Sequence, residues 1–383
     1  MSFGNSRFEI HGAQKIAAAL LLAFLLQALW LLAHLPLDLA ETRSALAGQA
    51  LWSTRETLEA RSPLIPGDSI LAIRLSGALP ALAGALGSNG YEFSIYAAPN
   101  RWLVRLPFVA FGLWLGGALW WVARRIFGDE GGYVALGLYC FSPPLLLTAS
   151  TVDSGILSAW GLFGFVYTAI GVAHTLYASP RKWRPRIGLL GVAIGLTAAA
   201  NLAAAIAGLV IAVAFMLYLA PGRRVAAMIV LAISSGIGTL VFLGCYGFQF
   251  ADIHASLVVP NVEYLRLTAH HMAMFLILPG GLLETAALLS ALVVFAVWRR
   301  TRYFGNWSPL LLAVSLPWWP GQFVSGASTM WALHFALTLI GGIFADLLEP
   351  TFFRGRFRTQ VVIAAFVLVG ASVALSLIVV TGA

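Results

Sequence analysis

Residues 187–219 read IGLLGVAIGLTAAANLAAAIAGLVIAVAFMLYL, a run of 33 residues that contains no charged side chain. A helix that crosses a bilayer needs about 20 apolar residues, so a single helix could use this length only with extreme tilt. The run therefore predicts two short membrane helices with a turn near Asn201. Such a hairpin returns the chain to the side of the membrane from which it came.

The whole chain has the same apolar character. Of its 383 residues, 60% are hydrophobic and 10% are charged, whereas soluble domains carry about 25% charged residues. Lipid must therefore be the solvent for most of the surface. Further candidate spans are residues 14–34, 103–123, 132–150, 154–177, 226–247, 273–297, 307–324, 330–348 and 361–380. We expect an all-α, polytopic membrane helical bundle of about eleven transmembrane helices, with residues 1–383 as a single membrane domain.

The basic residues predict how this bundle is oriented. With the N-terminus in the cytoplasm, 16 of the 23 basic residues fall at cytoplasmic ends, which agrees with the positive-inside rule. These residues are Arg7, Lys15, Arg124, Arg125, Arg181, Lys182, Arg184, Arg186, Arg223, Arg224, Arg299, Arg300, Arg302, Arg354, Arg356 and Arg358. The net charge of +8 is dispersed in short clusters, so it does not indicate nucleic-acid binding. We expect a multi-pass protein of the inner (plasma) membrane whose first helix is not cleaved.

Residues 35–102 form the first extracytoplasmic loop of this topology, and the loop is too long for a simple connector. Residues 41–60 predict an amphipathic interfacial helix, and residues 69–87 a second interfacial or re-entrant element. Acidic residues gather on this outer side: Asp38, Glu41, Glu56, Glu59, Asp68, Glu92, Asp153, Asp252 and Glu263. Because acidic residues carry little topological weight, a function on the outer face is one explanation for their bias.

Glu284 is a rare ionisable residue inside an apolar segment, and two interpretations remain open. It is either a mid-membrane carboxylate or a residue near the outer surface. The second interpretation holds if Pro279-Gly280-Gly281 starts the helix near residue 282.

Several segments, in order, resemble the GT-C superfamily of membrane glycosyltransferases. Residues 37–52 (LDLAETRSALAGQALW) are similar to the acidic motif and interfacial helix of the first outer loop in protein O-mannosyltransferases and the lipid A aminoarabinose transferase, the family 39-like enzymes. Residues 105–157 are similar to the family's second to fourth helices: they begin with Arg-Leu-Pro, contain Ala-Arg-Arg-Ile-Phe-Gly and a Ser-Pro, and have Asp153 at the opening of the fourth helix. Residues 188–201 and 309–350 resemble later helices of the superfamily, and the whole resemblance covers about two thirds of the chain.

The motifs depart from the family pattern at several points. Asp38 and Glu41 are separated by Leu39-Ala40 where the family has adjacent acids, and the His-Pro-Pro of the first loop is absent. The basic and tyrosine positions before the late helix are replaced by residues 328–331, which read STMW. The resemblance therefore implies the scaffold more strongly than the catalytic residues.

The resemblance implies sugar transfer from a polyprenyl-phosphate donor at the outer face. The reaction needs a base for the acceptor, positive charge or a metal for the departing phosphate, and a groove for the isoprenoid chain. Asp38 or Glu41 is the expected base, and Asp153 is expected to bind a divalent metal (Mg or Mn) or to orient the base. The candidates for binding the phosphate are Arg101, Arg105, Arg266, His270 and His271.

Each of these residues also has a structural explanation. Asp38 and Glu41 suit the start of an interfacial helix, and Asp153 before Ser154 suits an N-cap. Arg101 and Arg105 suit anchoring to lipid headgroups, and His270-His271 suits a polar interface pair. Two other functions therefore remain: a catalytically inactive GT-C-like subunit with a membrane-protein partner, or a transporter with polar groups near the midplane.

Overall fold

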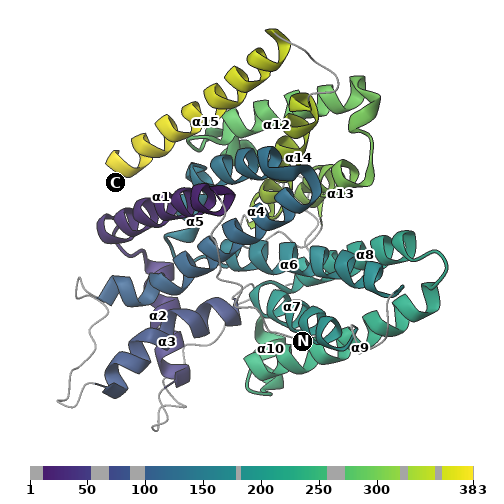
Figure 1. Ribbon diagram of the computed structural model, residues 1–383. Helices are drawn as coiled ribbons and strands as arrows, with labels where there is room; N and C mark the ends of the chain where they lie inside the picture. The colour runs from purple at the N-terminus through teal and green to yellow at the C-terminus, as the bar shows by residue number, and fades with distance from the viewer. Residues whose placement is uncertain are drawn as a thin grey trace, which may run out of the picture.

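The computed structural model describes residues 12–52, 69–86, 100–177, 183–256, 272–319, 327–349 and 356–382, and these residues form an all-helical bundle (Figure 1). The α-helices are α1 (Gly12–His34), α2 (Leu39–Trp52), α3 (Ile70–Leu86), α4 (Asn100–Cys140), α5 (Pro143–Ala149), α6 (Ser154–Thr175), α7 (Arg184–Ala200), α8 (Leu202–Leu219), α9 (Arg224–Cys245), α10 (Phe250–Ser256), α12 (Gly281–Val297), α13 (Phe304–Ser315), α14 (Ala327–Leu348) and α15 (Arg356–Gly382). Two short 3-10 helices, η3 (Arg299–Thr301) and η4 (Leu316–Trp318), flank α13. The expectation of an all-α fold is confirmed.

Within the described ranges, seven helices are long and apolar enough to cross a membrane: α1, α4, α6, α8, α9, α14 and α15. The protein is therefore a multi-pass membrane protein. The count of seven differs from the eleven expected spans for two reasons. Helix α4 is continuous through two of those spans, with a kink at Gly128 (φ 84°). Helices α7, α12 and α13 lie on three others but are only 17, 17 and 12 residues long.

The predicted hairpin in residues 187–219 is confirmed. Helix α7 ends at Ala200, Asn201 is extended (φ −161°, ψ 116°), and its side chain accepts a hydrogen bond from the Ala204 amide at the start of α8. Trp183, before α7, donates to the Thr175 carbonyl at the end of α6 (2.8 Å), and Arg223, after α8, donates to the neighbouring Leu176 carbonyl. The chain thus enters and leaves the hairpin at the same end of α6.

The two predicted elements of the first loop are helices α2 and α3, which cross with their backbones in contact. A Cβ atom on Gly48 would lie 2.0 Å from the Ile73 carbonyl oxygen. The buried face of α2 carries Glu41, Ala45 and Gly48, while Leu46 is exposed. The close contact of Gly48 with α3 therefore decides which side of α2 is covered. Residues 53–60 of the predicted helix lie outside the described residues.

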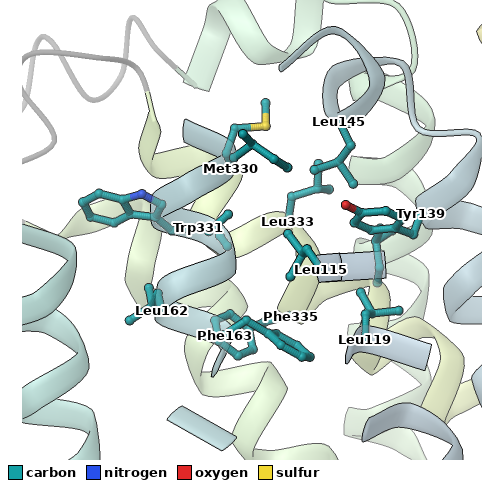
Figure 2. Close-up of a cluster of buried hydrophobic side chains, with 14 of the residues drawn as sticks. Leu115, Leu119, Tyr139, Leu145, Leu162, Phe163, Met330, Trp331, Leu333 and Phe335 are labelled. Carbon is teal, nitrogen blue, oxygen red and sulfur yellow. The ribbon is translucent and has the colours of Figure 1, made fainter. Parts of the chain in front are cut away.

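Helix α14 runs through the middle of the bundle and packs against α4, α6, α12 and α13. Figure 2 shows Trp331 and Phe335 of α14 among side chains of α4, α5 and α6. The Trp331 indole donates to the Ser158 hydroxyl at 2.7 Å, so the buried N–H is satisfied. Packing of this density makes α14 a rigid support for the helix ends around it.

The bundle has two chemically different ends. One, called here the acidic end, holds Asp38, Glu41 and Asp153. The other, the basic end, holds Arg124, Arg125, Arg299, Arg300 and Arg358.

Helix α14 starts near the acidic end, where Met330 contacts the Thr148 hydroxyl at 3.7 Å. Its other half packs at Gly341 against Gly131, just past the kink of α4. Helix α15 returns, and its Val380 carbonyl accepts from Trp30 near the end of α1 (2.9 Å).

Candidate functional site

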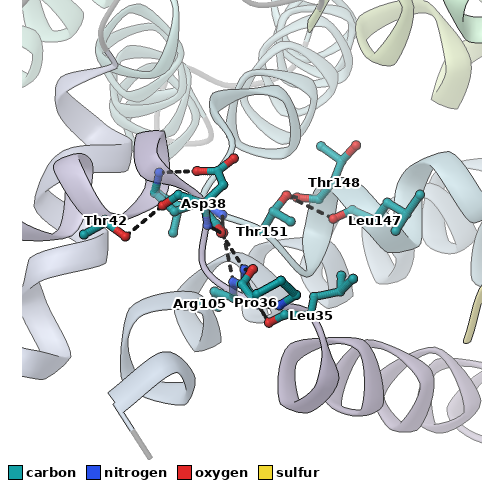
Figure 3. A network of polar contacts seen from close by, with 10 residues as sticks. Leu35, Pro36, Asp38, Thr42, Arg105, Leu147, Thr148 and Thr151 are labelled. Atoms are coloured by element: carbon teal, nitrogen blue, oxygen red, sulfur yellow. Dashed lines mark hydrogen bonds and ion pairs between the residues drawn. The ribbon is translucent and has the colours of Figure 1, made fainter. Parts of the chain in front are cut away.

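The acidic end is built around a fully buried ion pair between Glu41 of α2 and Arg105 of α4. The Arg105 Nε donates to Glu41 Oε1 at 2.8 Å, and a terminal nitrogen of the guanidinium lies 2.5 Å from Oε2. Two further guanidinium hydrogens reach the carbonyls of Leu35 (2.8 Å) and Pro36 (2.7 Å), as Figure 3 shows. The side chains of Arg105 and Glu41 are 1% and 4% exposed, so each charge depends on the other for stabilisation.

Glu41 also accepts two backbone hydrogen bonds. The Asp38 amide donates to Oε2 at 3.1 Å, while Asp38 Oδ1 accepts from the Glu41 amide at 2.6 Å. This reciprocal arrangement is a capping box at the start of α2. The Val152 amide donates to Glu41 Oε1 at 2.8 Å. One carboxylate therefore joins the loop after α1, the start of α4 and the segment that precedes α6.

Asp38 remains the accessible carboxylate of the group. Its side chain is exposed, and only Oδ1 is shown in a hydrogen bond. The Thr42 hydroxyl donates to the Asp38 main-chain carbonyl at 2.7 Å and so fixes the residue without occupying its carboxylate (Figure 3). Of the two expected bases, Asp38 is the one whose oxygens face solvent.

Asp153 caps α6, as the sequence suggested, and its Oδ1 accepts from the Gly155 amide at 2.8 Å. Its place directly after Val152 puts it beside the Glu41 network. Burial raises the pKa of the Asp153 carboxyl above its ordinary value, and the charges of Glu41 and Asp38 raise it further, against the lowering effect of the Gly155 amide. The three predicted acidic residues are thus electrostatically coupled in one region.

The predicted cationic residues have different positions. Arg101 lies one turn before Arg105 at the start of α4 and is partly buried. Arg105 is buried within the network, so its guanidinium holds Glu41 and the loop after α1 and does not face solvent. Arg266, His270 and His271 lie outside the described residues.

A divalent metal was expected beside Asp153. In the part of the chain that the structure describes, no group of three or more His, Cys, Asp or Glu side chains could hold a metal ion. Glu41 is already occupied by Arg105 and two amides. The described residues therefore do not fit a metal site with three protein ligands.

The contacts that hold this site in place join residues far apart in the chain and were not predicted. The Glu41–Arg105 pair joins residues 64 apart in the chain, and the Ser76 hydroxyl of α3 donates to the Ser44 carbonyl of α2 at 3.1 Å. An early signal was available: Arg105 stands close to an apolar span, and a cation there requires an anionic partner. The pattern of residues could not identify which acid it would be.

Comparison with solved structures supplies the fold class. The chain is similar to the Archaeoglobus fulgidus oligosaccharyltransferase in its apo form (TM-score 0.57, 11% identity, 97% of this chain and 56% of that chain). It is also similar to the same enzyme with zinc and sulfate (TM-score 0.56, 12% identity, 94% and 52%). A third structure is the archaeal oligosaccharyltransferase AglB from that organism with an inhibitory peptide and a dolichol-phosphate (TM-score 0.54, 11% identity, 94% and 55%). The chain has the GT-C fold.

These similarities show the fold alone. The chain spans about half the length of the oligosaccharyltransferases that it matches. No protein-family model matches the sequence, and no curated protein matches it. The resemblance to GT-C enzymes is therefore confirmed for the architecture, at low sequence identity.

Proposed function

We propose that the protein transfers a sugar from a polyprenyl-phosphate-linked donor to an acceptor at the acidic end of the bundle. The observation that carries the proposal is the gathering of Asp38, Glu41 and Asp153 at one end of a GT-C fold. Oligosaccharyltransferases of this fold have been captured with a dolichol-phosphate and with an acceptor peptide, which supports lipid-linked chemistry.

In the proposed reaction, Asp38 takes the proton of an acceptor hydroxyl or amine. The freed electron pair forms a bond to the anomeric carbon, the bond from that carbon to the phosphate oxygen breaks, and the polyprenyl phosphate leaves with the electron pair. Glu41 and Arg105 act as positioning residues that fix Asp38 through the capping box. Asp153 orients the acceptor, and Arg101, Arg266, His270 and His271 are the proposed partners of the phosphate.

The proposed orientation follows from charge. The acidic end faces the extracytoplasmic side, and the basic end, with the N-terminus, faces the cytoplasm. The inner (plasma) membrane is the expected location.

The experiment is sugar transfer from polyprenyl-phosphate donors in membranes that contain the wild type, Asp38→Asn or Asp153→Asn. Asp129→Asn is the matched control, because Asp129 pairs with Arg124 at the basic end. Loss of a general base lowers the rate by about 10²- to 10⁴-fold, so Asp38→Asn is expected to lose nearly all activity. The Asp129 variant should retain it at equal protein level.

A second function is a non-catalytic membrane subunit of a larger complex. The observation that favours it is the saturation of Glu41 by Arg105, Asp38 and Val152, which makes that carboxylate structural. Folded wild type without turnover on any donor, together with co-purification of a membrane-protein partner, would select this function over the enzyme.

A further inference from the structure

An apolar groove of about 370 Å³ runs between α12, α14 and α15. Its extent is marked by Leu283 and Val294 on α12, Ile340 and Leu347 on α14, and Val361 and Leu368 on α15. Helices α12 and α15 both pack on α14 and hardly touch each other, an arrangement visible in the upper part of Figure 1. The groove is in the size range of ligand sites, roughly 300–1,000 Å³.

The groove lining offers no polar partner to a ligand. Ser290 is a hydroxyl-bearing residue of the lining, and its hydroxyl is bonded to the Ala286 carbonyl of its own helix (2.8 Å). Everything else in the lining is aliphatic or phenyl, so the part of a ligand held there is a hydrocarbon chain.

The groove belongs to the half of the bundle next to the basic end. It uses the last turns of α14, up to Leu347, and the first turns of α15, from Val361. Arg358 is exposed one helical turn before Val361, and residues at this spacing are neighbours on a helix surface. Arg299 is exposed just after α12 ends at Val297. Two exposed arginines therefore flank the groove lining in sequence, Arg358 before its first residue on α15 and Arg299 after its last residue on α12.

The described segments beside these two arginines carry further charged groups, namely Arg300, Arg302, Asp346 and Glu349. Arg302 is turned back onto α12, where it donates to the Phe295 carbonyl at 3.3 Å. Asp346 accepts from Asn306 (2.8 Å) and Tyr303 (3.3 Å), on the side of α14 that meets α13. Glu349, exposed after the end of α14, is the further acidic residue of this segment.

We propose that this groove binds an anionic phospholipid of the leaflet at the basic end, with an acyl chain between the three helices and the phosphate at Arg299 and Arg358. Arginines that border a pocket between membrane helices attract anionic headgroups, with about 1 kcal/mol for each cation near the surface. The site lies at the opposite end of the bundle from Asp38 and Asp153, so it does not depend on the proposed glycosyl transfer.

The test is native mass spectrometry of the purified full chain in detergent, titrated with phosphatidylglycerol or phosphatidylcholine. The wild type is expected to retain phosphatidylglycerol preferentially. Arg358→Gln and Arg299→Gln are each expected to weaken its binding about fivefold. Arg125→Gln removes a charge from the same end beside Trp121 and should leave binding unchanged.

A second pair of variants tests the groove itself. Ala364→Phe fills the groove from α15, whereas Val367→Phe adds the same ring at a position that is 64% exposed and outside the lining. Only the first should abolish retention of phosphatidylglycerol, with both proteins equally monodisperse.

Three results would overturn the proposal. They are equal retention of the two phospholipids, equal effects of the two Phe variants, and displacement of phosphatidylglycerol by a polyprenyl phosphate at equimolar concentration. The last result would show that the groove holds the lipid of a sugar donor. Loss of sugar transfer in Asp38→Asn leaves this proposal unaffected, so the two proposals fail separately.

Discussion

Two glutamates illustrate how this bundle handles buried charge. Glu41 and Glu284 each lie in the first turn of a helix, and they are 4% and 6% exposed. Glu41 meets Arg105 and the Val152 amide from distant segments, and the Asp38 amide of its own capping box. The two carboxyl oxygens of Glu284 meet no arginine or backbone amide within the residues that the structure describes, and the Ser142 side chain is a polar group beside them. The same residue type in the first turn of a helix is thus compensated in one region and costly in the other, and the partner makes the difference.

The region around Glu284 also clarifies its position. Helix α12 begins at Gly281, as the Pro-Gly-Gly break suggested, and Gly280 (φ 88°) packs against Pro143 at the break between α4 and α5. Glu284 is nevertheless buried against the bundle and does not lie on its surface. A helix start alone therefore did not bring this carboxylate to water.

The largest expected effect comes from removal of the partner of Glu41. Arg105→Ala leaves a buried, uncompensated carboxylate and is expected to lower the apparent free energy of unfolding by about 3–5 kcal/mol. The measurement is unfolding in mixed detergent micelles. Arg101→Ala, one turn away, is the control, with an expected change within about 0.5 kcal/mol. Equal losses in the two variants would mean that the pair does not hold the acidic end together.

A smaller effect is expected where α2 and α3 cross. Gly48→Ala places a Cβ against the Ile73 carbonyl oxygen and must move one helix, at a cost of about 1–3 kcal/mol. On α3, Gly84 has open space around its Cβ position, so Gly84→Ala should be neutral or stabilising by about 0.5–1 kcal/mol. Thermal unfolding of the two variants in one detergent separates the cost of steric overlap at the crossing from the higher helix propensity of alanine. A stable Gly48→Ala would contradict the close crossing.

Replacement of the two glutamates by leucine tests the comparison directly. Glu284→Leu removes a buried carboxyl that has no charged partner among the described residues and only a weak contact with the Ser142 side chain, so it is expected to stabilise the protein by about 1 kcal/mol. Glu41→Leu strands Arg105 and should destabilise the protein. Unfolding of both variants under identical conditions gives the sign of each change in the free energy of unfolding. Destabilisation by Glu284→Leu as large as that by Glu41→Leu would show that Glu284 has a partner in the remaining chain.

The smallest effect concerns pH. Because the pKa of Asp153 is raised in the folded state, the folded protein binds its proton more tightly than the unfolded chain does. That contribution is fully present below the ordinary carboxyl pKa of about 3.9 and is lost as the pH rises through the folded pKa. Relative to Asp153→Asn, which keeps the cap, the wild type should therefore lose stability over this pH range. A difference between the two proteins that is independent of pH would contradict the shift.

The features of the site that were predictable are hydrogen bonds between residues close together in the sequence. The cap formed by Asp153 and the capping by Asp38 and Glu41 use amides within three residues, so the residue types and their spacing were enough to suggest them. The roles given to Arg105 and Glu41 were harder to predict. Both were candidates for chemistry, and their burial together shows that Glu41 is held by the fold and that Asp38 is the carboxylate left open.

The sequence by itself determined that lipid surrounds most of the protein surface and that the fold is all-helical. It also determined the hairpin at Asn201 and the separation of the acidic end from the basic end. These features follow from the length of apolar runs and the order of charges, which are local properties of the chain. Only the tertiary structure decided that Glu41 finds Arg105 while Glu284 meets no arginine among the described residues, and that α12, α14 and α15 leave a groove between them. The physical reason is that desolvation and packing depend on where helices far apart in the chain cross, and no run of neighbouring residues contains that information.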